Sequence, residues 1–207
     1  MAQTQRQEDT RRMPFAAPAP SRALQLLWQH LAPIRHPHFL ECGPVSQSTL
    51  DVLLLRGARL YVADLITPAR QNTAAFWTRR GKTAVFLADD FLAQIPAIPP
   101  ESISAICCWG LLDLLPREAL PVLVERFYSL LQPGGVLFCI LREPYLAAGA
   151  EARWWFETLT VVGSSAGKQK PFPYPAVTNR EMERLFPDGN VKTFLTRSGR
   201  REVLGIK

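Results

Sequence analysis

The sequence predicts an α/β fold, in which helices cover a mostly parallel sheet that ends in an antiparallel C-terminal hairpin. Short apolar segments alternate with amphipathic stretches along most of the chain. Segments such as Val136–Leu141 are apolar throughout, which is typical of a parallel strand covered on both faces. The last two apolar segments instead flank the basic turn Arg197–Arg201, and this arrangement indicates a hairpin.

The composition fits one globular domain that follows a tail. Of the 207 residues, 47% are hydrophobic and 20% are charged, which is typical of a folded, soluble protein. No apolar run approaches the roughly 18 to 20 residues that span a bilayer, so we expect no membrane partner. Residues 1–20 mix charges with Pro and Ala and lack the apolar core of a secretory signal. We interpret them as a flexible tail before a single domain, residues 21–207.

The elements of this domain are expected in a regular order. A lead helix over residues 21–33 begins at Ser21, a suitable N-cap, and ends at Pro33. Five parallel strands are then expected at His38–Glu41, Arg59–Ala63, Thr83–Leu87, Ile103–Cys108 and Val136–Leu141. The helices between them are expected at Ser48–Arg56, opened by an S-x-x-D box, at Pro68–Arg80 and at Arg117–Leu131.

Residues 142–207 break this alternation, and we expect 142–178 to face a substrate. Arg153–Phe156 is interpreted as an aromatic-rich helical segment, and Ser164–Pro175 as a flexible Pro-rich lid. A short helix at Asn179–Phe186 then precedes the two hairpin strands, Val191–Thr196 and Glu202–Ile206.

Charge and cysteine content narrow the class of protein. The formal charge is +6, and most of it lies in residues 153–207, which hold ten basic and five acidic side chains. Residues 23–152 hold ten basic and eleven acidic side chains, so the predicted sheet half is nearly neutral. The four cysteines lie in apolar segments without metal or disulfide spacing. We therefore expect reduced, buried thiols in a cytoplasmic protein, and no metal site.

Several candidate site residues, among them four acids and two glycines, lie at or just after the ends of the expected strands. They are Glu41 and Gly43, then Asp64 and Leu65, then Asp89, Asp90 and Phe91, and finally Cys108, Trp109 and Gly110. The carboxyl ends of parallel strands meet at one edge of the sheet, where open α/β sheets bind ligands. Ionised carboxylates accept hydrogen bonds from ribose hydroxyls and from amines. The sequence therefore predicts a ligand site at this edge.

The order of strands, the strand-end residues and the L-Q-P-G-G turn at Leu131–Gly135 resemble class I S-adenosylmethionine-dependent methyltransferases. The resemblance covers residues 34–207. It implies a doubly wound, Rossmann-like methyltransferase fold with a seven-stranded sheet, whose residues 34–141 bind S-adenosylmethionine. Methyl transfer to a small-molecule acceptor is then the expected activity.

The resemblance also implies a role for each group of strand-end residues. Glu41, Gly43 and Ser46 would lie around the methionine part of the cofactor, and Asp64 with Leu65 around the ribose. Asp89, Asp90 and Phe91 would lie by the adenine, and Cys108, Trp109 and Gly110 beside the methyl donor. No residue is assigned as catalytic, because methyl transfer depends mainly on positioning. The motifs typical of methylation at nucleic-acid bases are absent.

The glycine-rich loop departs from the family pattern, since Val45 and Gln47 stand where further glycines are common. Glycine is used there because a Cβ atom obstructs close approach of the backbone to a ligand. One hypothesis is that the loop still binds the cofactor. The other is that the pocket is partly closed, and that the protein is a catalytically silent binding or scaffold protein.

Several of these residues also have a purely structural interpretation. Asp64 could simply begin a turn, and Asp89 or Asp90 could cap a helix. Asp113 is expected on a solvated flank. For the acceptor we expect contacts from Tyr145, Trp154, Trp155 and Tyr174. Nucleic-acid binding through the basic C-terminal region is kept as an alternative, and the sequence leaves the oligomeric state open.

Overall fold

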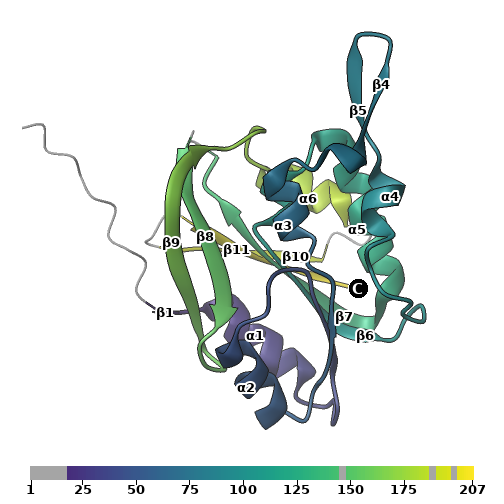
Figure 1. Cartoon of the computed structure of the whole chain (residues 1–207). Coiled ribbons are helices and arrows are strands. Elements are labelled where there is room, and N and C mark those ends of the chain that lie inside the picture. Colours follow the sequence, from purple (N-terminus) through teal and green to yellow (C-terminus); the bar gives the residue numbers. More distant parts are fainter. Residues whose placement is uncertain (1–17, 145–147, 187–189, 197–199) are drawn as a thin grey trace, which may run out of the picture.

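The computed structural model describes residues 18–144, 148–186, 190–196 and 200–207. Its centre is a six-stranded sheet in the order β10-β11-β7-β6-β2-β3 (Figure 1). These strands are β2 (His38–Glu41), β3 (Arg59–Val62), β6 (Ile103–Trp109), β7 (Leu131–Arg142), β10 (Val191–Leu195) and β11 (Arg200–Ile206). β3, β2, β6 and β7 run parallel, whereas β11 is antiparallel to both of its neighbours, β7 and β10. The predicted class of fold is therefore confirmed.

Helices cover both faces of this sheet. They are α1 (Arg22–Leu31), α2 (Gln47–Leu55), α3 (Ile66–Gln71), α4 (Ala88–Leu92), α5 (Leu120–Leu130) and α6 (Asn179–Leu185). On β11, Glu202 accepts a hydrogen bond from Ser21, the N-cap of α1, and the preceding residue, Arg201, donates to Asn179 of α6. Successive strand residues point to opposite faces, so α1 and α6 lie on opposite sides. This double cover explains why every residue of β6 is buried.

The expected third parallel strand is not part of the central sheet. Thr83–Leu87 forms β5 (Thr83–Phe86), which pairs only with β4 (Trp77–Arg80) in a separate antiparallel hairpin. The predicted helix over Pro68–Arg80 likewise ends at Gln71, and Asn72 follows with a φ of +49°. Arg79, Arg80 and Lys82 surround the hairpin turn, and a charged segment is poorly suited to a sheet covered on both faces. The predicted count of seven strands is wrong, because the expected third strand pairs with this charged segment and not with the central sheet.

The interpretation of residues 142–178 is also corrected. The expected helical segment and lid form instead a long antiparallel hairpin, β8 (Ala148–Phe156) and β9 (Val161–Pro171). The short strand β1 (Ala19–Pro20) pairs with β9, so the segment read as a tail ends in the smaller sheet, while residues 1–17 lie outside the described ranges. Alternation with a period of two is the signal that was missed, since Trp154 and Phe156 face the core.

Candidate functional site

Two strand ends meet at the centre of the sheet's carboxyl edge. Glu41 ends β2 and Trp109 ends β6, and the two strands are neighbours. The carboxyl group of Glu41 is 3% exposed and accepts the backbone N–H of Gly43 at 3.0 Å. It also accepts the indole N–H of Trp109. Glu41 is therefore hydrogen-bonded to both Gly43 and Trp109, on the edge where the sequence predicts a ligand site.

Burial decides the charge of Glu41. Loss of water around this carboxyl raises its pKa from 4.5 to about 8, although the hydrogen bonds from Trp109 and Gly43 lower it. The negative charge of Asp64 adds to the rise, and Arg153 opposes it. At neutral pH the Glu41 carboxyl is therefore mainly protonated, and it offers a neutral acceptor rather than an anion.

The space in front of Gly43 is filled by side chains of this chain. A Cβ atom on Gly43 would lie 3.0 Å from Ile66 Cδ1, 3.3 Å from Trp109 Cδ1 and 3.4 Å from Glu41 Oε1. The Trp109 ring in turn packs against Phe138 and Phe156, with centroids 5.6 and 5.1 Å away. A side chain at position 43 would therefore be crowded, and the Ile66 and Trp109 side chains lie close to the Gly43 backbone in the described conformation.

Asp64 lies in the turn between β3 and α3. Its two carboxylate oxygens accept the backbone N–H of Thr67 at 3.0 Å and the hydroxyl of Thr67 at 2.6 Å. The next residue, Leu65, is fully buried and does not face a ligand site. Asp64 therefore holds a turn together, as its purely structural interpretation predicts. Each carboxylate oxygen still has a second lone pair, so the half-buried group can also accept hydroxyl groups of a ligand.

Neither Val45 nor Gln47 supplies any of the three atoms nearest to a Cβ atom on Gly43. Gln47 is exposed and its side chain donates to Asp51 at 2.8 Å. The carbonyl oxygen of Val45 instead accepts the guanidinium of Arg153, at 2.9 Å, which ties β8 to the loop. Ser46, and not the expected Ser48, caps α2, because its hydroxyl accepts the Thr49 N–H at 3.1 Å.

The other residues that were expected to bind the cofactor are not part of the hydrogen-bonded cluster of Glu41, Gly43 and Trp109. Asp89 and Asp90 are exposed in the first turn of α4, and neither caps that helix. Phe91 is buried against Phe76 and Phe86, with centroids 5.3 Å away in each case. The Sγ atom of Cys108 is buried 3.0 Å from that of Cys139, on the inner part of the sheet. Gly110 is half-buried and begins a 3-10 turn.

The residues that were expected to contact the methyl acceptor point in different directions. Trp154 lies on the core side of β8, beneath the Arg200 guanidinium at 5.0 Å from the ring centroid. Trp155 lies on the other side, where its indole N–H donates to Glu157 at 2.6 Å. The two tryptophans therefore cannot line the same cleft. Tyr174 is half-buried, and Tyr145 lies outside the described residues.

Asp113 is buried, contrary to the expected solvated flank. It is 2% exposed and accepts the backbone N–H groups of Arg142 at 2.8 Å and Val177 at 3.3 Å. The pKa of Asp113 is raised because burial removes water from its carboxyl group. The two hydrogen bonds and the charges of Arg142 and Arg201 oppose this rise. The position of Asp113 within the apolar run Leu111–Leu115 could have indicated that it is buried. A buried carboxylate needs hydrogen-bond or charge partners, which Asp113 has.

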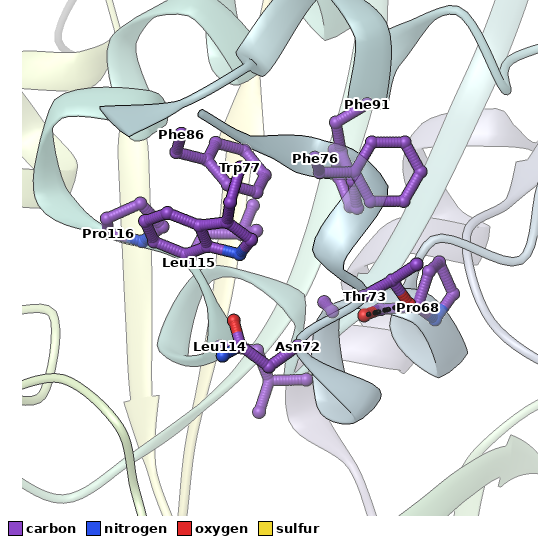
Figure 2. A pocket seen from close by; sticks show the side chains of 11 residues that line it. Pro68, Asn72, Thr73, Phe76, Trp77, Phe86, Phe91, Leu114, Leu115 and Pro116 are labelled. Atoms are coloured by element: carbon purple, nitrogen blue, oxygen red, sulfur yellow. Dashed lines mark hydrogen bonds between the residues drawn. The ribbon is translucent and has the colours of Figure 1, made fainter. Parts of the chain in front are cut away.

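An aromatic hollow lies away from the strand-end site. It is shallow and partly open to solvent, and its enclosed volume of about 10 Å³ holds little more than one water molecule. Figure 2 shows Trp77, Phe86 and Phe91 on its walls, together with Asn72 and Pro116. None of Glu41, Gly43 and Asp64 lines it. Within the described ranges no group of side chains could hold a metal ion, and no helix is long and apolar enough to cross a bilayer.

Comparison with known proteins gives low-identity structural matches. No protein-family model matches the chain, and no curated protein matches it significantly. The structure of Burkholderia thailandensis 1,6-didemethyltoxoflavin-N1-methyltransferase, with 1,6-didemethyltoxoflavin and S-adenosylhomocysteine bound, is 16% identical with a TM-score of 0.49. The match covers 89% of this chain and 76% of that one.

Two further structures are S-adenosylmethionine-dependent methyltransferases. The one from Methanosarcina mazei is 14% identical, with a TM-score of 0.46, over 84% of this chain and 93% of that one. The one from Mesorhizobium loti is 11% identical, with a TM-score of 0.42, over 88% and 96%. Independently of these numbers, the order of strands and the antiparallel pair β11-β10 give this chain a Rossmann-like methyltransferase fold.

Proposed function

We propose that the protein binds S-adenosylmethionine at the carboxyl ends of β2, β3 and β6 and transfers its methyl group to a small-molecule acceptor. The supporting observation is the cluster of Glu41, Gly43 and Trp109, with Asp64 near enough to affect the pKa of Glu41. When bound, the cofactor would supply an electrophilic methyl group on a sulfonium. The chain's own contribution is to hold donor and acceptor in contact.

Binding requires a local rearrangement. A ligand can approach Gly43 only if the side chains of Ile66 and Trp109 move from their described positions. Ile66 is buried in the first turn of a six-residue helix, so its movement would have to displace core neighbours or the short helix itself. Trp109 has a φ of +40°, an uncommon conformation for a bulky residue, and such conformations occur often at functional sites.

Calorimetric titration of the full chain with S-adenosylhomocysteine tests the proposal. We expect measurable binding by the wild type and tighter binding by Ile66→Ala, because this variant removes the atom closest to Gly43. Asp64→Asn keeps an oxygen for Thr67 but removes the charge, so it is expected to weaken binding by about tenfold. Leu55→Ala is the control, since Leu55 is 82% exposed.

A catalytically silent binding protein is the second candidate. The observation that favours it is the filled space at Gly43, together with a Glu41 that is neutral at neutral pH. If neither the folded wild type nor Ile66→Ala binds S-adenosylhomocysteine, the cofactor proposal is wrong and this second function stands. Binding that is the same in wild type and Asp64→Asn would also contradict the proposed ribose contact.

A further inference from the structure

The hairpin of β4 and β5, residues 77–86, forms a ribbon that projects from the domain. Its register pairs Arg80 with Thr83, which leaves Gly81 and Lys82 as a two-residue turn. Gly81 has a φ of +64°, and a Cβ atom there would meet nothing within 4 Å. Figure 1 shows this ribbon standing clear of the helices beside it. We call residues 77–86 the basic ribbon.

The tip of the basic ribbon carries an uncompensated positive charge. Arg79, Arg80 and Lys82 are all exposed, and in the described part of the chain none of them forms an ion pair. The whole stretch from residue 65 to residue 88 contains no carboxylate. The nearest acids in sequence are Asp89 and Asp90, which follow the base of the ribbon. The tip therefore concentrates three cations on a small protruding element.

The base of the basic ribbon is rigidly held. Trp77 and Phe86 are cross-strand partners with ring centroids 5.2 Å apart, and Phe86 packs on the buried Phe91 at 5.3 Å (Figure 2). The N–H of Leu87 donates to the carbonyl of Phe76 at 2.8 Å, which closes the base. The tip is thus presented in a fixed direction, and a partner does not have to order it.

The arrangement of the cations favours a groove lined by phosphates on both sides. Arg79 and Arg80 are adjacent on one strand, so their side chains leave opposite faces of the ribbon, and Lys82 stands at the turn between them. A flat acidic protein surface would meet only one of these faces. The three residue pairs beyond Trp77 and Phe86 extend about 10 Å at roughly 3.3 Å per residue. This length suits a DNA major groove about 12 Å wide and 8.5 Å deep, which admits a two-stranded ribbon.

We propose that the basic ribbon is a binding element for double-stranded DNA, with its tip in the major groove and Arg79, Arg80 and Lys82 on the phosphates of both walls. This surface is separate from the strand-end site and does not depend on cofactor binding. It also differs from the C-terminal basic region that the sequence offers as a nucleic-acid surface.

Fluorescence anisotropy with a labelled duplex of about two helical turns tests the proposal, on the full chain, between about 50 and 200 mM salt. The ribbon variant R79Q/R80Q/K82Q is compared with R180Q/R184Q/K192Q, which removes the same charge from exposed C-terminal positions. We expect the ribbon variant to bind about tenfold or more weakly, and its salt dependence to be shallower by roughly two to three in log–log slope. The C-terminal variant should keep most of the affinity.

Several results would overturn the proposal. These are no duplex binding by the folded wild type, or a loss confined to the C-terminal variant. Single-stranded DNA of the same sequence binding as tightly as the duplex would exclude groove insertion. Competition by polyglutamate at the same charge concentration as the duplex would indicate an acidic protein partner instead. Unchanged thermal unfolding of both variants ensures that lost binding reports on the removed charges.

Discussion

At the scale of single residues, Glu41 has the most unusual environment at the site. It is buried at the end of β2 and bonded to Gly43 and Trp109, and burial raises its pKa to about 8. The unfolded chain releases this proton near pH 4.5, whereas the folded protein keeps it until about pH 8. The contribution of Glu41 to stability is therefore complete below about pH 4.5 and is lost as the pH rises through about 8.

This linkage predicts the behaviour of Glu41→Gln. The amide oxygen can still accept from Gly43 and Trp109, but it has no proton to lose. Between about pH 5 and pH 8 the free energy of unfolding of the wild type should fall relative to that of the variant by on the order of 3 kcal/mol. Urea denaturation at both pH values measures the difference. Parallel pH profiles for the two proteins would show that Glu41 titrates normally.

The sequence identified the residues at this point, but not their arrangement. Glu41, Gly43 and Trp109 could be selected because each stands at the end of a buried strand, which is a local property. That Ile66 fills the space in front of Gly43 could not be predicted, because Ile66 follows a different strand and its position depends on the packing of α3. Asp113 was misplaced for the same reason, since its partners Arg142 and Val177 are distant in sequence.

At the scale of elements, Phe186, the C-cap residue of α6, packs on β11. Gly205 of β11 lies directly beneath the ring of Phe186, and a Cβ atom there would be 1.9 Å from Phe186 Cε1. Gly205→Ala should therefore destabilise the protein by about 2 to 3 kcal/mol, because the ring has to leave its buried position. Chemical denaturation measures this loss.

Two comparisons make this prediction specific. Gly110→Ala is the control, since its nearest atom would be 4.0 Å away, and we expect a change of at most about 0.5 kcal/mol. Adding Phe186→Leu to Gly205→Ala should recover part of the lost stability. Equal effects of the two single alanine variants would contradict the proposed contact between α6 and β11.

At the scale of the whole molecule, the core encloses all four thiols. Cys42, Cys107, Cys108 and Cys139 are unpaired by disulfides and at most 1% exposed. Burial also raises the pKa of the first three above 9.0, which suppresses the reactive thiolate. We expect no reaction of the native protein with an aromatic disulfide reagent, and four equivalents in urea. Absorbance of the released thiolate measures this, and rapid labelling of one cysteine in the native protein would refute the enclosed core.

Much of the order of strands and helices was determined by the sequence itself. Apolar segments, their period and the turns that separate them are local properties, and they predicted four of the five expected parallel strands and the antiparallel C-terminal pair. Only the tertiary structure decided which strands join the central sheet and whether the strand-end site is open. Residues 77–86 stand outside the sheet, and Ile66 and Trp109 fill the space at Gly43. Pairing and packing depend on residues far apart in the chain, and no local pattern records them.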